Sequence, residues 1–308
     1  MRTESFLLSV LVYLGFLGLF SVSLFTAHSL ADDTKQNLTI YTVNYPLQYF
    51  AKRIGGAYVD VVFPAPTDVD PAYWTPGRDV IIEFQNADRI LLNGADYAKW
   101  IGKVTLSKSK LVDTSRSFKS DYIALDDTLT HSHGPGDKHA HTGVAFTTWL
   151  DPLFAISQAE VIKEALIRLL PGQKEYFSSN YEALKSDLGE LDKRIETIVS
   201  IDPNKPLLTS HPVYQYLARR YNLNLKSLHW EPDEVPGPDQ LNKLEIILEN
   251  HPSKWMIWED EPGEEIRALL TTGGIQSIVF SPSSNKPEKG NYLDVMSKNI
   301  ENLMQAYK

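Results

Sequence analysis

The histidines of this 308-residue chain are spaced in a way that would allow them to bind a metal ion. Four of the eight histidines lie between residues 131 and 141, on both sides of a Gly-Pro-Gly-Asp turn. They are His131, His133, His139 and His141. Imidazole nitrogens bind zinc and copper, and four of them in a flexible segment can surround one ion. The spacing predicts metal capture by this segment, although polar loops of biased composition also occur without a function.

His211 is a second candidate ligand, because it follows an apolar segment at 206–209 that reads as a buried strand. A lone histidine in such a place can be a hydrogen-bonded structural residue or a metal ligand. It cannot hold zinc tightly by itself, since zinc takes four ligands. The chain contains no cysteine, so we expect no disulfide, no thiolate metal site and no lipid-modified cysteine.

Common catalytic motifs are absent from the sequence, namely Gly-x-Ser-x-Gly, His-Glu-x-x-His and a phosphate-binding glycine loop. Ser210 and His211 are adjacent, but neighbouring side chains point in different directions and do not form a catalytic dyad by themselves. We therefore expect a binding protein rather than an enzyme.

The elements that must position these residues alternate between strand and helix, which predicts an α/β fold with mostly parallel sheets flanked by helices. Strands are expected at 38–43, 59–63, 89–92, 206–209, 225–228, 255–258 and 275–280. Helices are expected at 46–55, 79–86, 155–170, 214–221, 238–250, 264–270 and 292–307. The polar segment at 125–143 interrupts the alternation, and we expect a mobile loop there.

One further segment has the clearest helical periodicity, with apolar residues at alternating steps of four and three. These are Phe177, Tyr181, Leu184, Leu188, Leu191, Ile195 and Ile198. The pattern predicts a helix roughly 40 Å long. Because it lies between two α/β halves, we expect a connecting helix at 172–200 between an N-terminal lobe at 32–171 and a C-terminal lobe at 201–308. A core helix of another fold or a coiled-coil seam would have the same periodicity.

The first residues resemble an export signal. Arg2 precedes an apolar run at 6–25, and Ser29 and Ala31 supply the small residues of a signal-peptidase site. We expect a signal peptide at 1–31, cleavage after Ala31 and a periplasmic folded part; an uncleaved membrane anchor is the alternative. The formal net charge of -9 argues against nucleic acid and anionic membranes as partners.

Short motifs along the mature chain resemble, in their order and spacing, the cluster A-I (cluster 9) binding proteins of zinc and manganese ABC importers. The motifs are Tyr45-Pro46, Asp70-Pro71 with Tyr73, Asn93-Gly94-Ala95, Trp149-Leu150-Asp151-Pro152, Ser210-His211, the segment 216–221, Glu231-Pro232 and the segment 292–296. Each motif is weak alone, but together they are specific. The resemblance implies two lobes joined by one long rigid helix, with a metal site in the cleft between them.

The resemblance also implies three histidine ligands with a carboxylate or water, and this chain departs from that set. The first ligand position holds Ala72 or, without a gap, Pro71; the second holds Thr147, and the fourth holds Ser281. His211 alone matches, so we expect the cleft site to be absent or rebuilt with neighbouring carboxylates. The candidates are Asp68, Asp70, Glu231, Glu259 and Asp260, each of which could instead be a solvated loop charge or a helix cap.

Five aromatic residues are expected to approach the cleft, namely Tyr45, Tyr73, Trp74, Trp149 and Trp230. They would either pack the interface between the lobes or line a pocket for an organic ligand or a metal chelate.

These observations predict a periplasmic substrate-binding protein of a zinc-type ABC importer, monomeric, with the membrane permease as its partner and zinc as the transported ion. Manganese, copper or a metal chelate are the alternative ligands. Alternative functions are a binding protein for another small solute, and a metal chaperone or adhesin without a transport role.

Overall fold

The computed structural model describes residues 37–125, 130–132, 138–140 and 143–308, and residues 37–308 form one compact unit. The predicted signal peptide and its cleavage site lie outside the described residues. In the described part of the chain, none of the helices combines the length and the apolar character that a membrane span requires.

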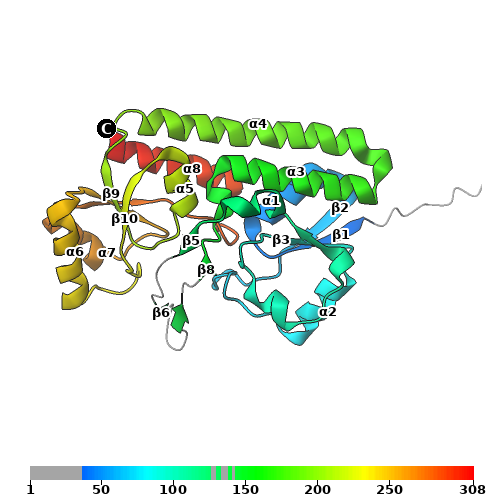
Figure 1. The fold of residues 1–308 in the computed structure, drawn as a ribbon, viewed down its shortest axis with the longest axis horizontal. Helices are drawn as coiled ribbons and strands as arrows, with labels where there is room; N and C mark the ends of the chain where they lie inside the picture. Colours follow the sequence, from blue (N-terminus) through cyan, green and yellow to red (C-terminus); the bar gives the residue numbers. More distant parts are fainter. Residues whose placement is uncertain (1–36, 126–129, 133–137, 141–142) are drawn as a thin grey trace, which may run out of the picture. The chain divides into compact units, whose positions relative to one another are not determined.

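The first half of the chain builds a four-stranded parallel sheet in the order β2-β1-β3-β4 (Figure 1). Its strands are β1 (Leu38–Thr42), β2 (Val59–Val62), β3 (Arg89–Leu92) and β4 (Leu111–Asp113). Helices α1 (Tyr45–Gly55) and α2 (Arg78–Asn86) lie in the connections. Helix α1 begins where the Asn44 side chain accepts the backbone N–H of Leu47 (3.2 Å), with Pro46 in the first turn.

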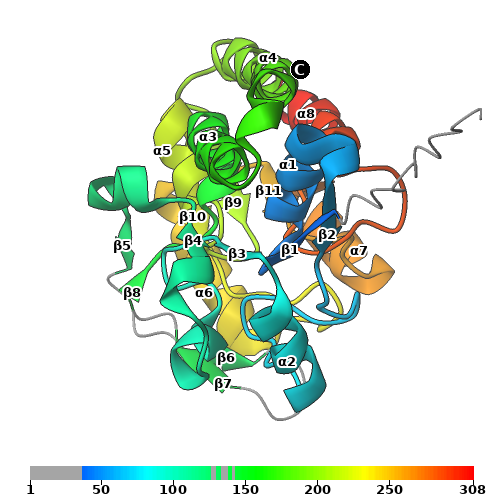
Figure 2. The same ribbon diagram turned by 90° about the vertical axis from the view of Figure 1, so that its right-hand side faces the viewer.

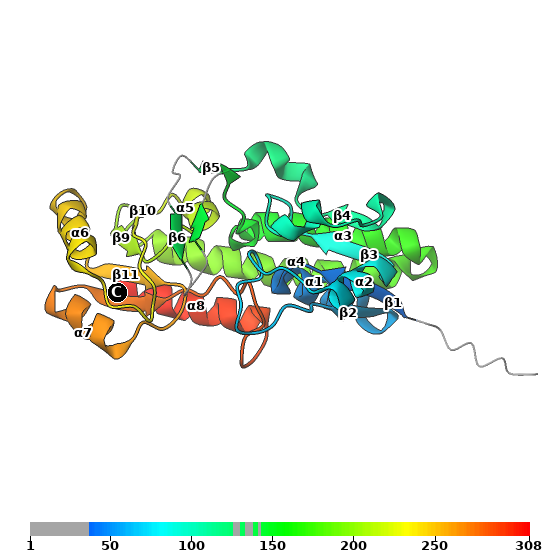
Figure 3. The same ribbon diagram turned by 90° about the horizontal axis from the view of Figure 1, so that it is seen from below.

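The second half builds another four-stranded parallel sheet in the order β10-β9-β11-β12. Its strands are β9 (Pro206–Thr209), β10 (Asn224–Ser227), β11 (Trp255–Trp258) and β12 (Gln276–Val279), with helices α5 (Gln215–Tyr221), α6 (Pro238–Asn250) and α7 (Glu264–Thr272) between them. Figure 3 shows α6 and α7 at the end of this sheet that is remote from β1. The two halves therefore repeat one strand order, in which the first strand lies between the second and the third.

A layer of helices covers both sheets, formed by α1, α3 (Pro152–Leu169), α4 (Lys174–Val199) and α8 (Tyr292–Tyr307) (Figure 2). Helix α4 packs against α1, α3 and α8. All seven residues of the predicted apolar stripe are buried, from Phe177 at 0% exposure to Leu191 at 6%. The periodic segment thus forms the long amphipathic helix that was predicted, because its apolar face is covered along its full length.

One hydrophobic cluster runs through both halves of the chain. It includes Ile40 and Leu91 from the first sheet, Leu207 and Ile278 from the second, and the buried stripe of α4. A rotation of one half against the other would expose part of this shared apolar surface to water. The helical layer and this shared core therefore join the two halves.

The histidine-rich segment contains short paired strands, so the expected loop at 125–143 is wrong for part of its length. Strand β5 (Ala124–Leu125) pairs with β8 (Gly143–Val144), and β6 (Thr130–Ser132) pairs with β7 (Lys138–Ala140). The β6–β7 register places the backbone of His131 opposite that of His139. The sequence Gly-Pro-Gly-Asp between two short runs favours such a hairpin. His133 and His141 lie outside the described residues.

The other expected helices and strands are present with small shifts at their ends. Helix α3 begins at Pro152 rather than at residue 155, because the side chain of Asp151 accepts the Leu153 N–H (2.9 Å) and caps the helix. Strand β4 has only three residues, which is too short for a hydrophobic pattern to be recognised, and the sequence did not predict it.

Candidate functional site

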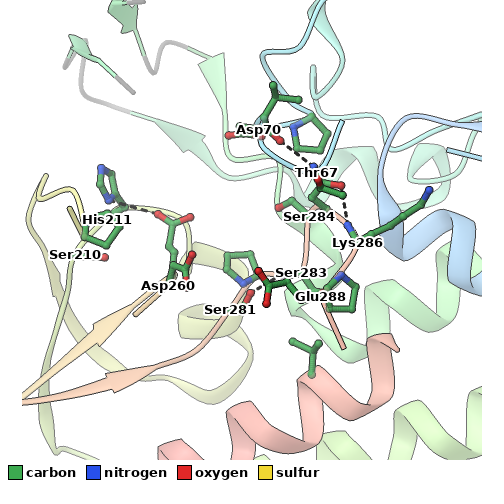
Figure 4. Close-up of a pocket in the computed structure, with 18 of the residues that line it drawn as sticks. Thr67, Asp70, Ser210, His211, Asp260, Ser281, Ser283, Ser284, Lys286 and Glu288 are labelled. Carbon is green, nitrogen blue, oxygen red and sulfur yellow. Dashed lines mark hydrogen bonds and ion pairs between the residues drawn. The ribbon is translucent and has the colours of Figure 1, made fainter. Parts of the chain in front are cut away.

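A cavity of about 660 Å³ lies between the two halves of the compact unit, beyond the carboxyl ends of the second sheet. Its lining comes from the segments that follow β2, β9, β10, β11 and β12. Figure 4 shows His211 and Asp70 on opposite sides of this cavity, with Ser281 and Ser283 on a further wall. Ligands of parallel α/β sheets bind beyond the carboxyl ends of the strands, so the strand order places this site.

His211 lies two residues beyond β9 and is 3% exposed. Its Nε2 atom is 3.2 Å from Oε1 of Glu231, and its Nδ1 atom is 3.5 Å from Oε1 of Glu259. Glu259 directly follows β11, which pairs with β9, so the sheet places this carboxylate beside the imidazole. Each nitrogen of the His211 ring therefore faces a carboxylate.

The segment after β10 brings Glu231 to the same place. The backbone N–H of Leu228 donates to the carbonyl of Thr209 (2.9 Å), and that of Trp230 donates to the carbonyl of Ser210 (3.0 Å). Beyond the end of β10, this segment therefore still runs beside the residues that follow β9. Leu228 and Trp230 are buried in the core of the second sheet. Side-chain alternation then places residues 229 and 231 on the other face of the segment.

His229 lies beside His211 as a consequence of this alternation. The two imidazole rings meet edge to face, with centroids 6.2 Å apart and an interplanar angle of 89°. The sequence reasoning missed His229. The sequence feature that could have identified it is the Leu-His-Trp-Glu pattern at 228–231, in which two apolar residues alternate with two possible metal ligands.

Within the described residues, no three histidine, aspartate or glutamate side chains already stand in an arrangement that holds a metal ion. At His211 both ring nitrogens face carboxylate oxygens. An incoming metal ion must therefore replace at least one of these contacts before it can bind the imidazole.

The other ligand positions implied by the resemblance serve packing and hydrogen bonding here. Ala72 is 1% exposed and Thr147 is 3% exposed, and the Thr147 hydroxyl donates to the carbonyl of Val213. Ser281 lines the cavity, and the side chain of Asn299 bonds both its backbone N–H (2.9 Å) and its carbonyl (2.7 Å). None of these three side chains carries an imidazole or a carboxylate.

The five carboxylates named as replacement ligands have different surroundings. Glu231 and Glu259 contact His211, whereas Asp68 is exposed and lies outside the lining of the cavity. Asp70 lines the cavity, but its Oδ1 accepts the N–H of Ala72 (2.8 Å) and so holds a turn. Asp260 also lines the cavity, and its Oδ1 accepts the N–H of Glu261 (2.7 Å).

The five aromatic residues expected at the cleft support its wall and the lobe cores. Among the described residues that line the cavity, none is one of these five, which are Tyr45, Tyr73, Trp74, Trp149 and Trp230. The indole N–H of Trp149 donates to the carbonyl of Pro282 (2.7 Å), and the backbone N–H of Tyr45 donates to the carbonyl of Ser284 (3.0 Å). Trp230 packs against Trp258 in the second sheet's own core.

The cavity is acidic. Its lining holds the carboxylates Asp70, Glu231, Glu259, Asp260 and Glu288, against one lysine, Lys286. Burial raises the pKa of Tyr73, and the charges of Asp70 and Glu259 raise it further, one from each side of the cavity. A concave site with this balance of charge attracts cations.

The segment at 281–288 ties the second half of the chain to the first. The Asn285 side chain donates to the carbonyl of Val69 (2.9 Å), and the Lys286 ammonium donates to the carbonyl of Phe63 (3.2 Å). Burial, together with the nearby charge of Lys52, lowers the pKa of Lys286. This wall of the cavity is therefore fixed to both halves.

The sequence matches the family model described as "Zinc-uptake complex component A periplasmic" (ZnuA) over residues 40–306. The chain belongs to the ZnuA family. It is 26% identical to the high-affinity zinc uptake system protein ZnuA of Bacillus subtilis, over 90% of this chain and 89% of that protein. It is 25% identical to the zinc-binding lipoprotein AdcA of Streptococcus pneumoniae over 87% of this chain, and it spans about half of that relative's length, 56%.

Solved structures share the ZnuA-type fold of two α/β lobes. The metal-dependent lipoprotein YcdH of Bacillus subtilis superposes with a TM-score of 0.76 at 22% identity, covering 88% of this chain and 99% of that one. The Zn(II)-bound ZnuA-like domain of Streptococcus pneumoniae AdcA superposes with a TM-score of 0.74 at 24% identity, with the same coverage of 88% and 99%. These structures confirm the expected fold class, and the family model confirms the family that the motifs resembled.

Proposed function

We propose that this chain is an exported zinc-binding protein that captures the ion in the acidic cavity and presents it to the membrane permease of an ABC importer. The observation that carries the proposal is the buried imidazole of His211 between the carboxylates of Glu231 and Glu259. Membership of the ZnuA family supports it, as do the names of relatives that bind or take up zinc. The protein acts as a monomer and binds its ion without catalysing a reaction.

The ligand chemistry of the cavity suits zinc. Imidazole nitrogen and carboxylate oxygen are ordinary zinc ligands, and a sulfur ligand is not needed. His211 supplies the nitrogen, and Glu231 or Glu259 supplies the oxygen once the ion has replaced one of the present contacts. The negative lining draws the cation into the cavity and holds it against bulk water.

The histidine-rich hairpin has a separate role in the proposal. His131, His133, His139 and His141 bind zinc weakly near the cavity and raise its local concentration. Removal of residues 131–141 should therefore abolish a weak class of sites and leave the tighter cavity site.

Zinc titration against a competing chelator tests these two roles. We expect the chain lacking residues 131–141 to bind one zinc ion tightly, and we expect His211→Gln in that background to weaken binding at least tenfold, roughly the loss of one of four ligands. His251→Gln is the matched control, because His251 is also buried but its Nε2 lies 2.9 Å from the carbonyl of Leu207, outside the cavity lining. Equal zinc affinity with and without His211 would rule out the cavity site.

A second candidate function is the capture of a zinc complex that brings its own ligands. The volume of about 660 Å³ favours it, because each water molecule needs only about 30 Å³ and a bare ion leaves most of the cavity to solvent. Native mass spectrometry of freshly purified protein separates the two candidates. An added mass equal to zinc alone supports the first, and an added organic mass supports the second.

A further inference from the structure

We propose that His229 is a second imidazole ligand, so that the zinc site is assembled entirely from the C-terminal half of the chain. The four ligands are His211, Glu231 and Glu259, which line the cavity, and His229, which is outside the lining and packs against the His211 ring. This inference rests on the proposed function of the cavity, and it adds a binding residue and moves the ion away from the N-terminal half.

Burial places His229 and Glu231 together on one side of the segment 228–231, because they alternate with the buried Leu228 and Trp230. Trp230, between them, is 2% exposed and packs in the core of the second sheet, so it fixes which way its two neighbours point. The first turn of α6 fixes the segment from its other side. The side chain of Gln240 donates to the carbonyl of His229 (3.2 Å) and accepts the N–H of Gly237 (2.9 Å).

The distance between the two imidazole rings is close to the distance expected for two imidazoles that bind one zinc ion. Two imidazoles on a tetrahedral zinc, with Zn–N bonds of about 2.0–2.1 Å, have ring centroids roughly 5 Å apart. The rings of His211 and His229 have centroids 6.2 Å apart. In the proposed site, the two side chains rotate to close this gap as the ion replaces the contact between His211 and Glu231.

The described residues of the N-terminal half offer few ligands for the ion. The two positions that would supply its ligands hold Ala72 and Thr147, which are 1% and 3% exposed and carry neither imidazole nor carboxylate. Asp70 faces the cavity but already holds its own turn through the N–H of Ala72. Among the described residues that line the cavity or contact His211, both nitrogen and oxygen ligands come from the turns that follow β9, β10 and β11.

Such a site would let the ion bind without drawing the two halves together. The halves already share one core, and the segment at 281–288 joins them at the cavity wall. Zinc binding then orders a few side chains within one half, and the site remains open toward the N-terminal half. This differs from a site that spans the cleft and needs ligands from both sides.

X-ray absorption at the zinc edge tests the inference, because the scattering of imidazole counts the histidines bound to the ion. The full chain is used with its four loop histidines changed to asparagine (H131N, H133N, H139N and H141N), so that only His211, His229 and His251 remain among the described histidines. We expect two imidazoles per zinc in this protein. We expect one imidazole and at least tenfold weaker binding when His229→Gln is added, and no change when His251→Gln is added.

The possible outcomes separate this inference from the proposed function. Tight zinc binding with the same imidazole count before and after His229→Gln would overturn the inference and leave the cavity site standing. Absence of tight zinc binding in the protein without loop histidines would overturn both. Thermal unfolding of each metal-free variant shows whether a loss of binding comes from a loss of folding, and a folded His229→Gln protein that keeps both imidazoles also counts against the inference.

Discussion

The indole N–H of Trp149 donates a 2.7 Å hydrogen bond to the carbonyl oxygen of Pro282. Trp149 belongs to the N-terminal half and is 1% exposed, whereas Pro282 lines the cavity in the segment that follows β12. The hydroxyl of Tyr292 donates to the carbonyl of Trp149 from the start of α8 (3.3 Å). A buried tryptophan therefore holds one wall of the cavity to both halves of the chain.

Trp149→Phe should destabilise the protein and weaken zinc binding together. The change leaves the Pro282 carbonyl without its indole donor, which costs about 1–3 kcal/mol in the free energy of unfolding. The matched control is Trp100→Phe, because Trp100 is also buried (3% exposed) but packs in the cluster of α2 on the first sheet. Urea unfolding and zinc titration check both variants. The same loss of zinc affinity in both would contradict a role of the Trp149–Pro282 bond in shaping the cavity.

Glu231→Gln should weaken zinc binding about 10- to 100-fold, because it removes the carboxylate charge nearest to Nε2 of His211. Glu245→Gln removes the same charge from an exposed position on α6 and should leave the affinity unchanged. Isothermal titration calorimetry on the chain without residues 131–141 measures both. Equal affinities of the two variants would show that Glu231 does not bind the ion.

Two carboxylates of α4 should contribute very differently to stability. Asp192 accepts two hydrogen bonds from Arg220 (3.0 and 2.7 Å) and one from the hydroxyl of Tyr221 (2.8 Å), and it is 7% exposed. Asp192→Asn should lower the free energy of unfolding by about 1.5–3 kcal/mol, since it weakens hydrogen bonds between a buried carboxylate and the guanidinium of Arg220, which is 27% exposed. Asp187 pairs with Arg53 at the surface (2.7 Å), so Asp187→Asn should cost less than about 1 kcal/mol. Urea unfolding that shows similar losses for both would contradict this difference.

Alkaline pH should destabilise the fold through its buried tyrosines. Burial raises the pKa of Tyr181 and of Tyr307 to about 12, with further contributions from Glu160 and Asp202 respectively. A pKa that is higher in the folded state means that the folded protein favours the neutral phenol. The stabilisation is therefore complete below the unfolded pKa of about 10 and is lost as the pH rises from about 10 to 12. The part of the absorbance change at 295 nm that is lost in Tyr181→Phe and in Tyr307→Phe should appear only as tryptophan fluorescence reports unfolding. If that part already appears near pH 10 in the folded protein, the prediction is wrong.

Much of the fold could be predicted from the sequence, because local patterns determine where helices and strands form. The apolar stripe from Phe177 to Ile198 specified α4, whereas the cap at Asp151, which begins α3 at Pro152, was not predicted. Strand β4 and the β6–β7 hairpin were not predicted, because three-residue strands are too short to carry a pattern and owe their pairing to neighbours.

The candidate site was predictable only in part. His211, Glu231 and Glu259 were named from motif order, but their contacts were not, since they lie on three different turns of the chain. Asp68 was named by the same reasoning and lies outside the cavity. His229 was missed because its position beside His211 depends on which face of the segment 228–231 is buried. That face is determined only when Trp230 packs in the core of the second sheet.

By itself, the sequence determined the alternating elements, the long helix, the family resemblance, the histidine-rich segment and the loss of three usual ligand positions at Ala72, Thr147 and Ser281. The tertiary structure decided that His211 stands between two carboxylates and beside His229. The physical reason is that local patterns specify elements one at a time, whereas the strand order β10-β9-β11-β12 brings the carboxyl ends of separate strands to a single edge.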